Sequence, residues 1–173
     1  MDAIKNIMER VSTRKFSDRP ISDEELKIIL DAAMAGPSAT NARPFSFIVV
    51  RDKEMLQKMA VANMKYSEPI TRATLGILVC GDLDRAYAAA PDFWVVDGSI
   101  AAQNMILAAH ALGIGSCWLG TWPVEERVNN HIELFNLPEN IIPHSLIAFG
   151  YPEGEFRTQK DRFEEDRVHY EKW

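Results

Sequence analysis

Apolar residues near the start of the chain recur every three or four positions, which is the period of an amphipathic helix. The first such stripe is formed by Ile4, Ile7, Met8 and Val11. It predicts a helix that ends near Arg10 or Val11, with one apolar side and one polar side.

A second helix is predicted after Pro20. Ser22 and Glu25 form the S-x-x-E pattern of a capping box, in which each side chain accepts a hydrogen bond from the other residue's backbone N–H. The apolar residues that follow keep helical spacing as far as Gly36 and Pro37, where the helix should stop.

Helical spacing and short apolar runs predict the other elements. Helices are predicted over residues 53–63 and from Pro123 through residue 135. Four apolar runs predict strands: FSFIVV at 45–50, LGILVC at 75–80, IGSCWLG at 114–120 and IIPHSLIAFGY at 141–151. The chain shows no internal repeat and no second apolar core, so one α+β domain over residues 1–173 is predicted.

The longest helix is predicted over about residues 92–112, with Gly113 as its C-terminal stop. Its sequence is apolar on nearly every side, and a helix without a polar side must be buried. We expect part of this burial in the protomer core and part against a second subunit. Ala101 is the small residue that we expect at that interface.

The tail, residues 152–173, combines many charges with isolated aromatic residues. These aromatic residues are Phe156, Phe163, Tyr170 and Trp173. Because aromatic side chains gain much free energy from burial, we expect the tail to dock, and the partner subunit is the favoured surface.

The net charge of −6 and the pI near 5.2 narrow the range of partners. Nucleic acids and anionic membranes both require a wide positive field, so neither is an expected partner. No apolar run reaches the length of a membrane span and the N-terminus lacks a secretion signal, so a cytoplasmic protein is expected. Cys80 and Cys117 lie in separate apolar runs and are predicted to be reduced, buried thiols.

The segment RVSTRKF offers binding groups where the first helix ends. Arg10, Ser12 and Arg14 alternate with apolar or small residues, so an extended chain would place all three on one side. Two guanidinium groups and a hydroxyl suit a phosphate, because guanidinium forks match its oxygens. A pair of solvated arginines at a helix end is the alternative interpretation.

The sequence offers few groups for self-contained catalysis. Its four histidines show no metal-ligand spacing and it has no G-x-S-x-G motif, so metal and serine-hydrolase chemistry are not expected. The glycines of GIGSCWLG follow a helix and precede a strand, which is the reverse of the dinucleotide-binding order. Asp97 is either a catalytic carboxylate or a hydrogen-bonded structural acid. We therefore expect a bound cofactor to supply the reactive group.

Four ordered segments together resemble the nitroreductase family: RVSTRKFSDRPIS, PSATNARPF, DGSIAAQNMILAAHALGIGSCWLG and LPENIIPHSLIAFGYPEG. The match covers nearly the whole chain. The resemblance implies an α+β fold with a central, mostly antiparallel sheet flanked by helices, and a homodimer in which the tail reaches the partner subunit. It also implies flavin mononucleotide (FMN) as cofactor and NADH or NADPH as hydride donor.

The resemblance further implies which residues would hold the flavin at the dimer interface. These are Arg10, Val11, Ser12 and Arg14 for the phosphate and ribityl chain, Lys160 or Arg162 of the tail for the phosphate, Leu119, Gly120 and Thr121 beside flavin N5, and Pro37, Ser38, Ala39 and Asn41 from the partner subunit.

The activity implied is ping-pong hydride transfer through flavin N5, without a catalytic side chain, to a nitroaromatic, quinone, flavin or halogenated acceptor. Arg43 and Phe45 stand where the family often has glutamine and tryptophan, and Ala39 replaces a common serine. The insertion that often covers the substrate is also missing, so the acceptor stays open. A flavin-binding protein without turnover, for storage or sensing, and a purely structural helical dimer are the alternatives.

Overall fold

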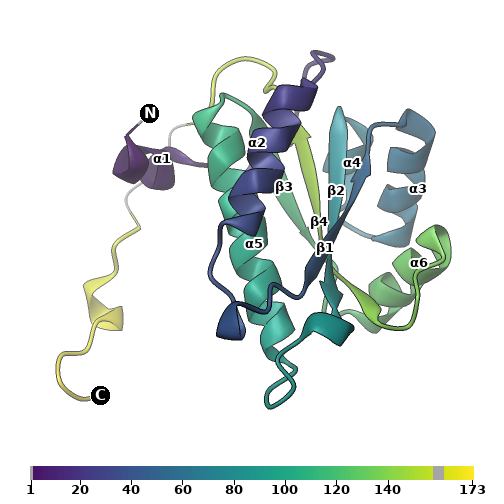
Figure 1. The fold of residues 1–173 in the computed structure, drawn as a ribbon. Helices are drawn as coiled ribbons and strands as arrows, with labels where there is room; N and C mark the ends of the chain where they lie inside the picture. The colour runs from purple at the N-terminus through teal and green to yellow at the C-terminus, as the bar shows by residue number, and fades with distance from the viewer. Residues whose placement is uncertain (1, 158–161) are drawn as a thin grey trace.

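The centre of the structure is a sheet of four antiparallel strands in the order β1–β2–β4–β3 (Figure 1). The computed structural model describes residues 2–157 and 162–173. The strands are β1 (Phe45–Val50), β2 (Leu75–Asp82), β3 (Gly115–Gly120) and β4 (Ile141–Gly150). All four predicted strands are confirmed, as is the α+β class.

The described part of the chain contains six α-helices, five of which cover the sheet while α1 lies on α5. They are α1 (Ala3–Glu9), α2 (Asp23–Met34), α3 (Lys53–Ala62), α4 (Glu68–Thr71), α5 (Phe93–Ala111) and α6 (Glu125–Phe135). Short 3-10 turns lie at η1 (Ala39–Asn41), η2 (Leu83–Arg85) and η3 (Glu165–Arg167). The five predicted helices are confirmed, whereas α4 was not predicted because a helix this short shows no apolar period.

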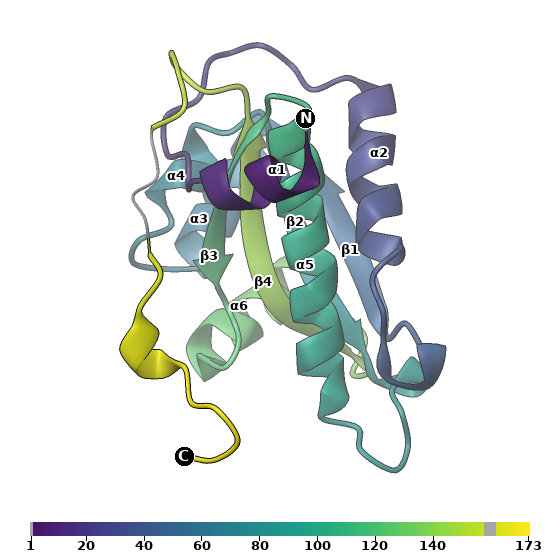
Figure 2. The ribbon, with the colours of Figure 1, turned by 90° about the vertical axis from the view of Figure 1, so that its left-hand side faces the viewer.

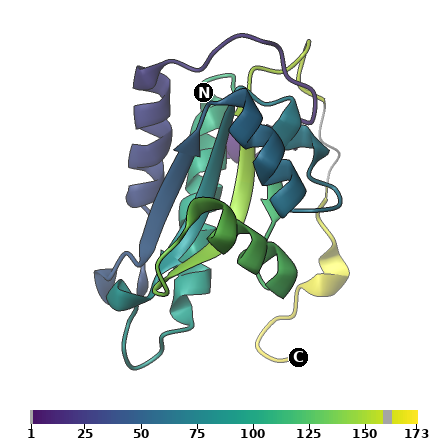
Figure 3. The same ribbon diagram turned by 90° about the vertical axis from the view of Figure 1, so that its right-hand side faces the viewer.

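Helices cover both faces of the sheet. α2 and α5 pack on one face, and α3, α4 and α6 pack on the other (Figures 1 and 3). β2 alternates between the two layers: Ile77 and Val79 join the core beneath α2 and α5, while Leu78 and Cys80 join the core beneath α3 and α4. Because both faces are covered, β2 is an unbroken apolar run and not an alternating one.

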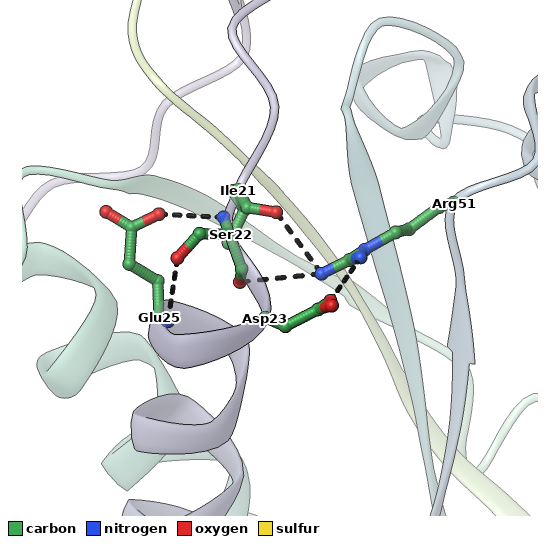
Figure 4. Close-up of polar contacts among 5 residues, drawn as sticks. All are labelled: Ile21, Ser22, Asp23, Glu25 and Arg51. Carbon is green, nitrogen blue, oxygen red and sulfur yellow. Dashed lines mark hydrogen bonds and ion pairs between the residues drawn. The ribbon is translucent and has the colours of Figure 1, made fainter.

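The start of α2 is fixed to the end of β1 (Figure 4). The predicted capping box is present, since the Ser22 Oγ accepts from the Glu25 N–H at 3.1 Å and the Glu25 carboxylate accepts from the Ser22 N–H at 2.9 Å. Arg51, which follows β1, pairs with Asp23 at 2.6 Å and donates to the Ile21 carbonyl at 3.2 Å. These contacts set the position of α2 along the sheet.

α5 runs along the sheet and contacts α2, β2, β3 and β4. Ala101 is fully buried among the core residues of this protomer, so the expectation that it lies at a subunit interface is wrong. The exposed side of α5 carries Val96, which is 50% exposed, and Gln103, with Ile100 and Leu107 half-buried beside them. A second subunit could cover this side of the helix.

α1 lies across the C-terminal half of α5 (Figure 2). Its buried Asn6 donates from Nδ2 to the Leu107 carbonyl at 2.9 Å and accepts at Oδ1 from His110 Nδ1 at 2.7 Å. The apolar stripe of α1 stays open, because Ile4 and Met8 are 68% and 59% exposed.

The described part of the tail lies on the outside of the protomer (Figure 1). Phe156 packs edge-on against His110, with 4.8 Å between the ring centroids, but Tyr170 and Trp173 are 81% and 99% exposed. Docking of the tail on a partner subunit therefore stays a prediction.

Cys80 and Cys117 are buried free thiols, as predicted. Burial raises the pKa of Cys80 to about 12 and also raises the pKa of Cys117. Among the described residues, no helix has the length and apolar character needed to cross a membrane.

Candidate functional site

The segment that follows α1 runs beside the start of β3. Ser12 forms a parallel bridge with Ser116, and the Thr13 N–H donates to the Ser116 carbonyl at 2.8 Å. Thr13 packs so closely on Gly115 that an added Cβ there would lie 2.7 Å from its side chain. A glycine is therefore needed for the segment to approach the strand, and the extended pairing directs Arg14 along the sheet edge.

A pocket of about 710 Å³ opens beside β3. Three of the predicted site residues, Arg14, Leu119 and Gly120, line it together. The charge of Arg14 also acts on Cys117 of β3, where it partly offsets the burial that raises the pKa of that thiol. A cation and an open backbone in one pocket suit a ligand that carries both an anionic group and a planar group.

Gly120 leaves its backbone accessible. An added Cβ at this position would meet nothing within 4 Å, so a planar group can approach the chain there. Leu119 and Thr121 are buried instead, and the Thr121 hydroxyl donates to Asn63 Oδ1 at 2.7 Å. Of the three predicted residues, Gly120 therefore offers its backbone to the pocket, while Leu119 and Thr121 hold the chain in place on either side of it.

Cations and carboxylates both lie around this pocket: Glu68 lines it together with the cations of Arg14, Lys65 and Arg127. Burial, and after it the nearby positive charge of Arg162, lowers the pKa of Arg10. Two neighbouring guanidinium groups repel each other unless an anion compensates them. Val11 and Ser12 line an adjoining cavity of about 330 Å³ together with Arg14. Lys160, the other tail cation expected here, lies outside the described residues.

The loop that carries Pro37, Ser38, Ala39 and Asn41 is strained. Asn41 has a φ of 58°, and Thr40 and Arg43 have φ values of 50° and 48°. All three lie in the left-handed region that residues other than glycine rarely adopt. The Arg43 N–H donates to Ser38 Oγ at 2.9 Å. Strain that is held by surrounding contacts is typical of ligand-binding loops.

Asp97 of α5 holds this loop. Its Oδ1 accepts from the Ala39 N–H at 3.0 Å, and its side chain is only 3% exposed. The second oxygen, Oδ2, is buried without a hydrogen-bond partner in the part of the chain that the structure describes. Of the two roles considered for Asp97, this contact favours the structural one.

One protomer does not bring the two groups of predicted residues together. The loop 37–41 is attached to α5 at Asp97, whereas α1, which leads into the segment 10–14, is attached through Asn6 at Leu107 and His110. At 1.5 Å per helical residue, these attachment points are about 15 to 20 Å apart.

Sequence reasoning missed a polar network behind the pocket. Asn63, the C-cap of α3, is 1% exposed and donates to Ser67 Oγ at 2.9 Å. Arg127 of α6 donates to the carbonyls of Gly120 and Lys65. In the sequence these residues look like an ordinary helix end and an ordinary surface arginine, so no pattern could have identified them.

Three buried histidines are held in their neutral form. Burial lowers the pKa of His131 to about 4 and also lowers the pKa of His144 and of His110. His144 lies between Ser99 Oγ at 3.2 Å and Ser145 Oγ at 3.0 Å, so hydroxyl groups satisfy both ring nitrogens. These histidines lie in the interior, and among the described residues no group of three or more histidine, cysteine, aspartate or glutamate side chains is placed to hold a metal ion.

Comparisons with known proteins agree with the resemblance. The family described as "Nitroreductase family" matches residues 7–66 and 61–151. The chain is 46% identical to a Methanothermobacter thermautotrophicus protein provisionally described as an NADH dehydrogenase/NAD(P)H nitroreductase, over all of this chain and 88% of that protein.

Solved structures show the same similarity. A crystal structure from Bacteroides thetaiotaomicron, with the same provisional description, aligns with a TM-score of 0.91 and 37% identity over 99% of this chain and 98% of that one. An FMN-dependent nitroreductase from Clostridium difficile aligns with a TM-score of 0.90 and 30% identity over 98% of this chain and 99% of that one.

The buried histidines predict that the fold weakens in mild acid. An unfolded histidine has a pKa near 6.5. Between about pH 6.5 and about pH 4, His131 is therefore protonated in the unfolded chain but stays neutral in the folded protein. The free energy of unfolding should therefore fall as the pH drops through this window, by about 3 kcal/mol from His131 alone. Urea unfolding at several pH values measures it.

His131→Gln should flatten this pH dependence, whereas His169→Gln, at an exposed position in the tail, should leave it unchanged. An equal slope in the wild type and in His131→Gln would contradict the assignment.

Proposed function

The chain belongs to the nitroreductase family, and from this premise we propose that the pocket beside β3 binds FMN and passes electrons from NADH or NADPH to a small electron-poor acceptor. The protein is an NAD(P)H-dependent flavoenzyme of the nitroreductase type. The observation that carries the proposal is the pocket itself, in which an open backbone at Gly120 and the cation of Arg14 line one cavity.

The phosphate end of the flavin would lie at the segment 10–14. Arg10 and Arg14 supply guanidinium groups, and Ser12 supplies a hydroxyl beside them. Burial lowers the pKa of Arg10 most and the charge of Arg162 lowers it further; a phosphate shared by the two guanidinium groups would relieve their repulsion.

The ring end would lie against Leu119, Gly120 and Thr121. With no side chain at Gly120, the ring can come within hydrogen-bonding reach of the backbone, and a backbone N–H there would face N5. When bound, the flavin accepts a hydride from the reduced nicotinamide at N5 and gives two electrons to the acceptor. The chain's own residues orient the ring and supply electrostatic stabilisation, so no side chain needs to act as a catalytic acid or base.

A second protomer would complete the site. In a two-fold dimer each contact occurs twice about the axis. An axis that crosses the exposed side of α5, near Ile100 and Gln103, would bring the loop 37–41 of one subunit to the segment 10–14 of the other. The open apolar stripe of α1 and the exposed aromatic residues of the tail supply further surface for such a dimer. We propose that the tail reaches the partner, as the family resemblance implies.

The acceptor would use the same space as the nicotinamide. One pocket that is used by two substrates in turn implies a ping-pong mechanism, with oxidised nicotinamide leaving before a nitroaromatic, quinone or flavin binds. A flavin-binding protein without turnover is the second candidate, because the same residues would serve storage or sensing.

Flavin binding should depend on the two ends of the pocket. Gly120→Leu should keep the fold, since an added Cβ meets no atom within 4 Å, but should block the flavin ring from reaching the backbone.

Arg14→Ala should weaken FMN binding roughly ten- to a hundredfold through loss of a charge-assisted hydrogen bond. Fluorescence titration measures both affinities, and thermal unfolding checks the fold. Lys27→Ala on the exposed side of α2 is the control. Wild-type affinity in both site variants would remove this pocket from flavin binding.

A mixed dimer tests whether the site is shared. Arg14→Ala damages the phosphate end, and Ala39→Trp would push bulk from the partner's loop into the ring site. Each homodimer should bind flavin at least about tenfold more weakly than the wild type. In the mixed dimer one site carries both defects and the other carries none, so tight binding should return at half of the sites. If no tight site returns, both residues serve the same protomer's pocket.

Steady-state kinetics test the reaction. Initial rates with reduced nicotinamide and a quinone or nitroaromatic should give parallel double-reciprocal lines, the pattern of a ping-pong mechanism. Intersecting lines would show a ternary complex instead. A flavin-loaded protein that does not oxidise reduced nicotinamide would favour the binding-protein alternative.

A further inference from the structure

Arg127 sits where the rules of helix formation disfavour a cation. It lies in the first turn of α6, where the partial positive charge of the helix favours acidic residues such as its neighbours Glu125 and Glu126. A residue that goes against such a local preference often contributes to a functional site.

Its guanidinium joins two walls of the pocket beside β3. Nη1 donates to the Gly120 carbonyl at 2.5 Å, and Nη2 donates to the Lys65 carbonyl at 3.2 Å. Gly120 ends β3, whereas Lys65 belongs to the loop between α3 and α4. Arg127, Gly120 and Lys65 all line the same pocket. Arg127 therefore ties the strand to the loop, beside the hydrogen bond of 2.7 Å that joins Thr121 to Asn63.

The loop on the far side needs such support. Met64 and Tyr66 have φ values of 63° and 73°, in the left-handed region that residues other than glycine rarely adopt. Asn63 also reaches the Gly120 carbonyl, but at 3.4 Å, so the bond from Arg127 is the shorter of the two.

The charge of Arg127 is not neutralised by a carboxylate. Among the ion pairs of the described residues, none includes Arg127, and its Nε is buried without a hydrogen-bond partner there. Arginine keeps its positive charge at all physiological pH values. Two carbonyl dipoles solvate the group, and Glu68, the carboxylate that lines this pocket, is paired with Arg72 at 2.6 Å, so Arg127 keeps its charge without a carboxylate partner of its own.

We propose that Arg127 is a positioning residue of the flavin site: it fixes the Gly120 backbone at the reacting edge of the ring, and its uncompensated charge favours the reduced flavin. The inference rests on the proposed function. A flavin gains negative charge when it takes up a hydride, so a cation held at the wall stabilises the reduced form over the oxidised form. A residue that only supported the fold would not shift this balance.

Three variants separate the charge from the geometry. Arg127→Gln removes the charge, and Arg127→Lys keeps it but cannot span both carbonyls with a planar fork. Lys58→Gln is the control, because Lys58 is an exposed cation on α3 that is already paired with Glu54 at 2.8 Å. The wild type is first titrated with FMN: if it binds none, the proposed function fails, and the inference about Arg127 falls with it.

The measured quantities are the two-electron midpoint potential of the bound flavin and the dissociation constant for FMN. Arg127→Gln should disfavour reduction at least about tenfold, which is a fall of about 30 mV. Arg127→Lys should keep the wild-type potential but weaken FMN binding about tenfold, and Lys58→Gln should change neither.

A folded Arg127→Gln protein with the wild-type potential would overturn the electrostatic role. A potential in Arg127→Lys as low as in Arg127→Gln would also overturn it, because the charge would then not be the cause. Should Arg127→Gln fail to fold, Arg127→Lys alone decides the positioning role, and wild-type FMN affinity in that variant would overturn it.

Discussion

The packing of α5 against the sheet is the interaction on which the other features depend. This helix buries residues such as Ala101, Ala102 and Met105 against the sheet and α2. Its polar side chains then act as attachment points, with Asp97 holding the loop 37–41 and His110 holding α1. Because a helix is rigid, it fixes the separation of these two groups at about 15 to 20 Å. This separation supports the proposal that a site using both groups draws them from two copies of the chain.

The sequence predicted the elements well because burial leaves a clear period. β2 is apolar from Leu75 to Cys80 since helices cover both of its faces, and the capping box at Ser22 and Glu25 is a local pattern that needs no tertiary information. The wrong expectation, that Ala101 faces a partner, has a physical cause. α5 is apolar on nearly every side, so its sequence does not show which side meets the sheet and which side meets a second subunit. Only the packed structure separates Ala101 from the exposed Val96.

The candidate site was predictable only in part. The alternation of Arg10, Ser12 and Arg14 is visible in the sequence, and the open backbone at Gly120 follows from a glycine in an edge strand. The network of Asn63, Thr121 and Arg127 is not visible, because its members come from three elements and bond mainly to backbone carbonyls and to each other. Such contacts depend on tertiary distance, and no spacing rule within one element reports it.

Strained backbone occurs on both sides of the proposed active centre. Thr40, Asn41 and Arg43 in one loop, and Met64 and Tyr66 in the other, all have positive φ values without being glycine. Each such residue costs on the order of 1 to 3 kcal/mol, so the surrounding contacts must hold it in place. Asp97 does so for the first loop and Arg127 for the second. A mechanism in which the cofactor reacts needs this kind of protein contribution, because a hydride moves only between atoms held at a fixed distance. The side chains of Asp97 and Arg127 therefore hold backbone in place, which is what the proposed hydride transfer without a catalytic side chain requires.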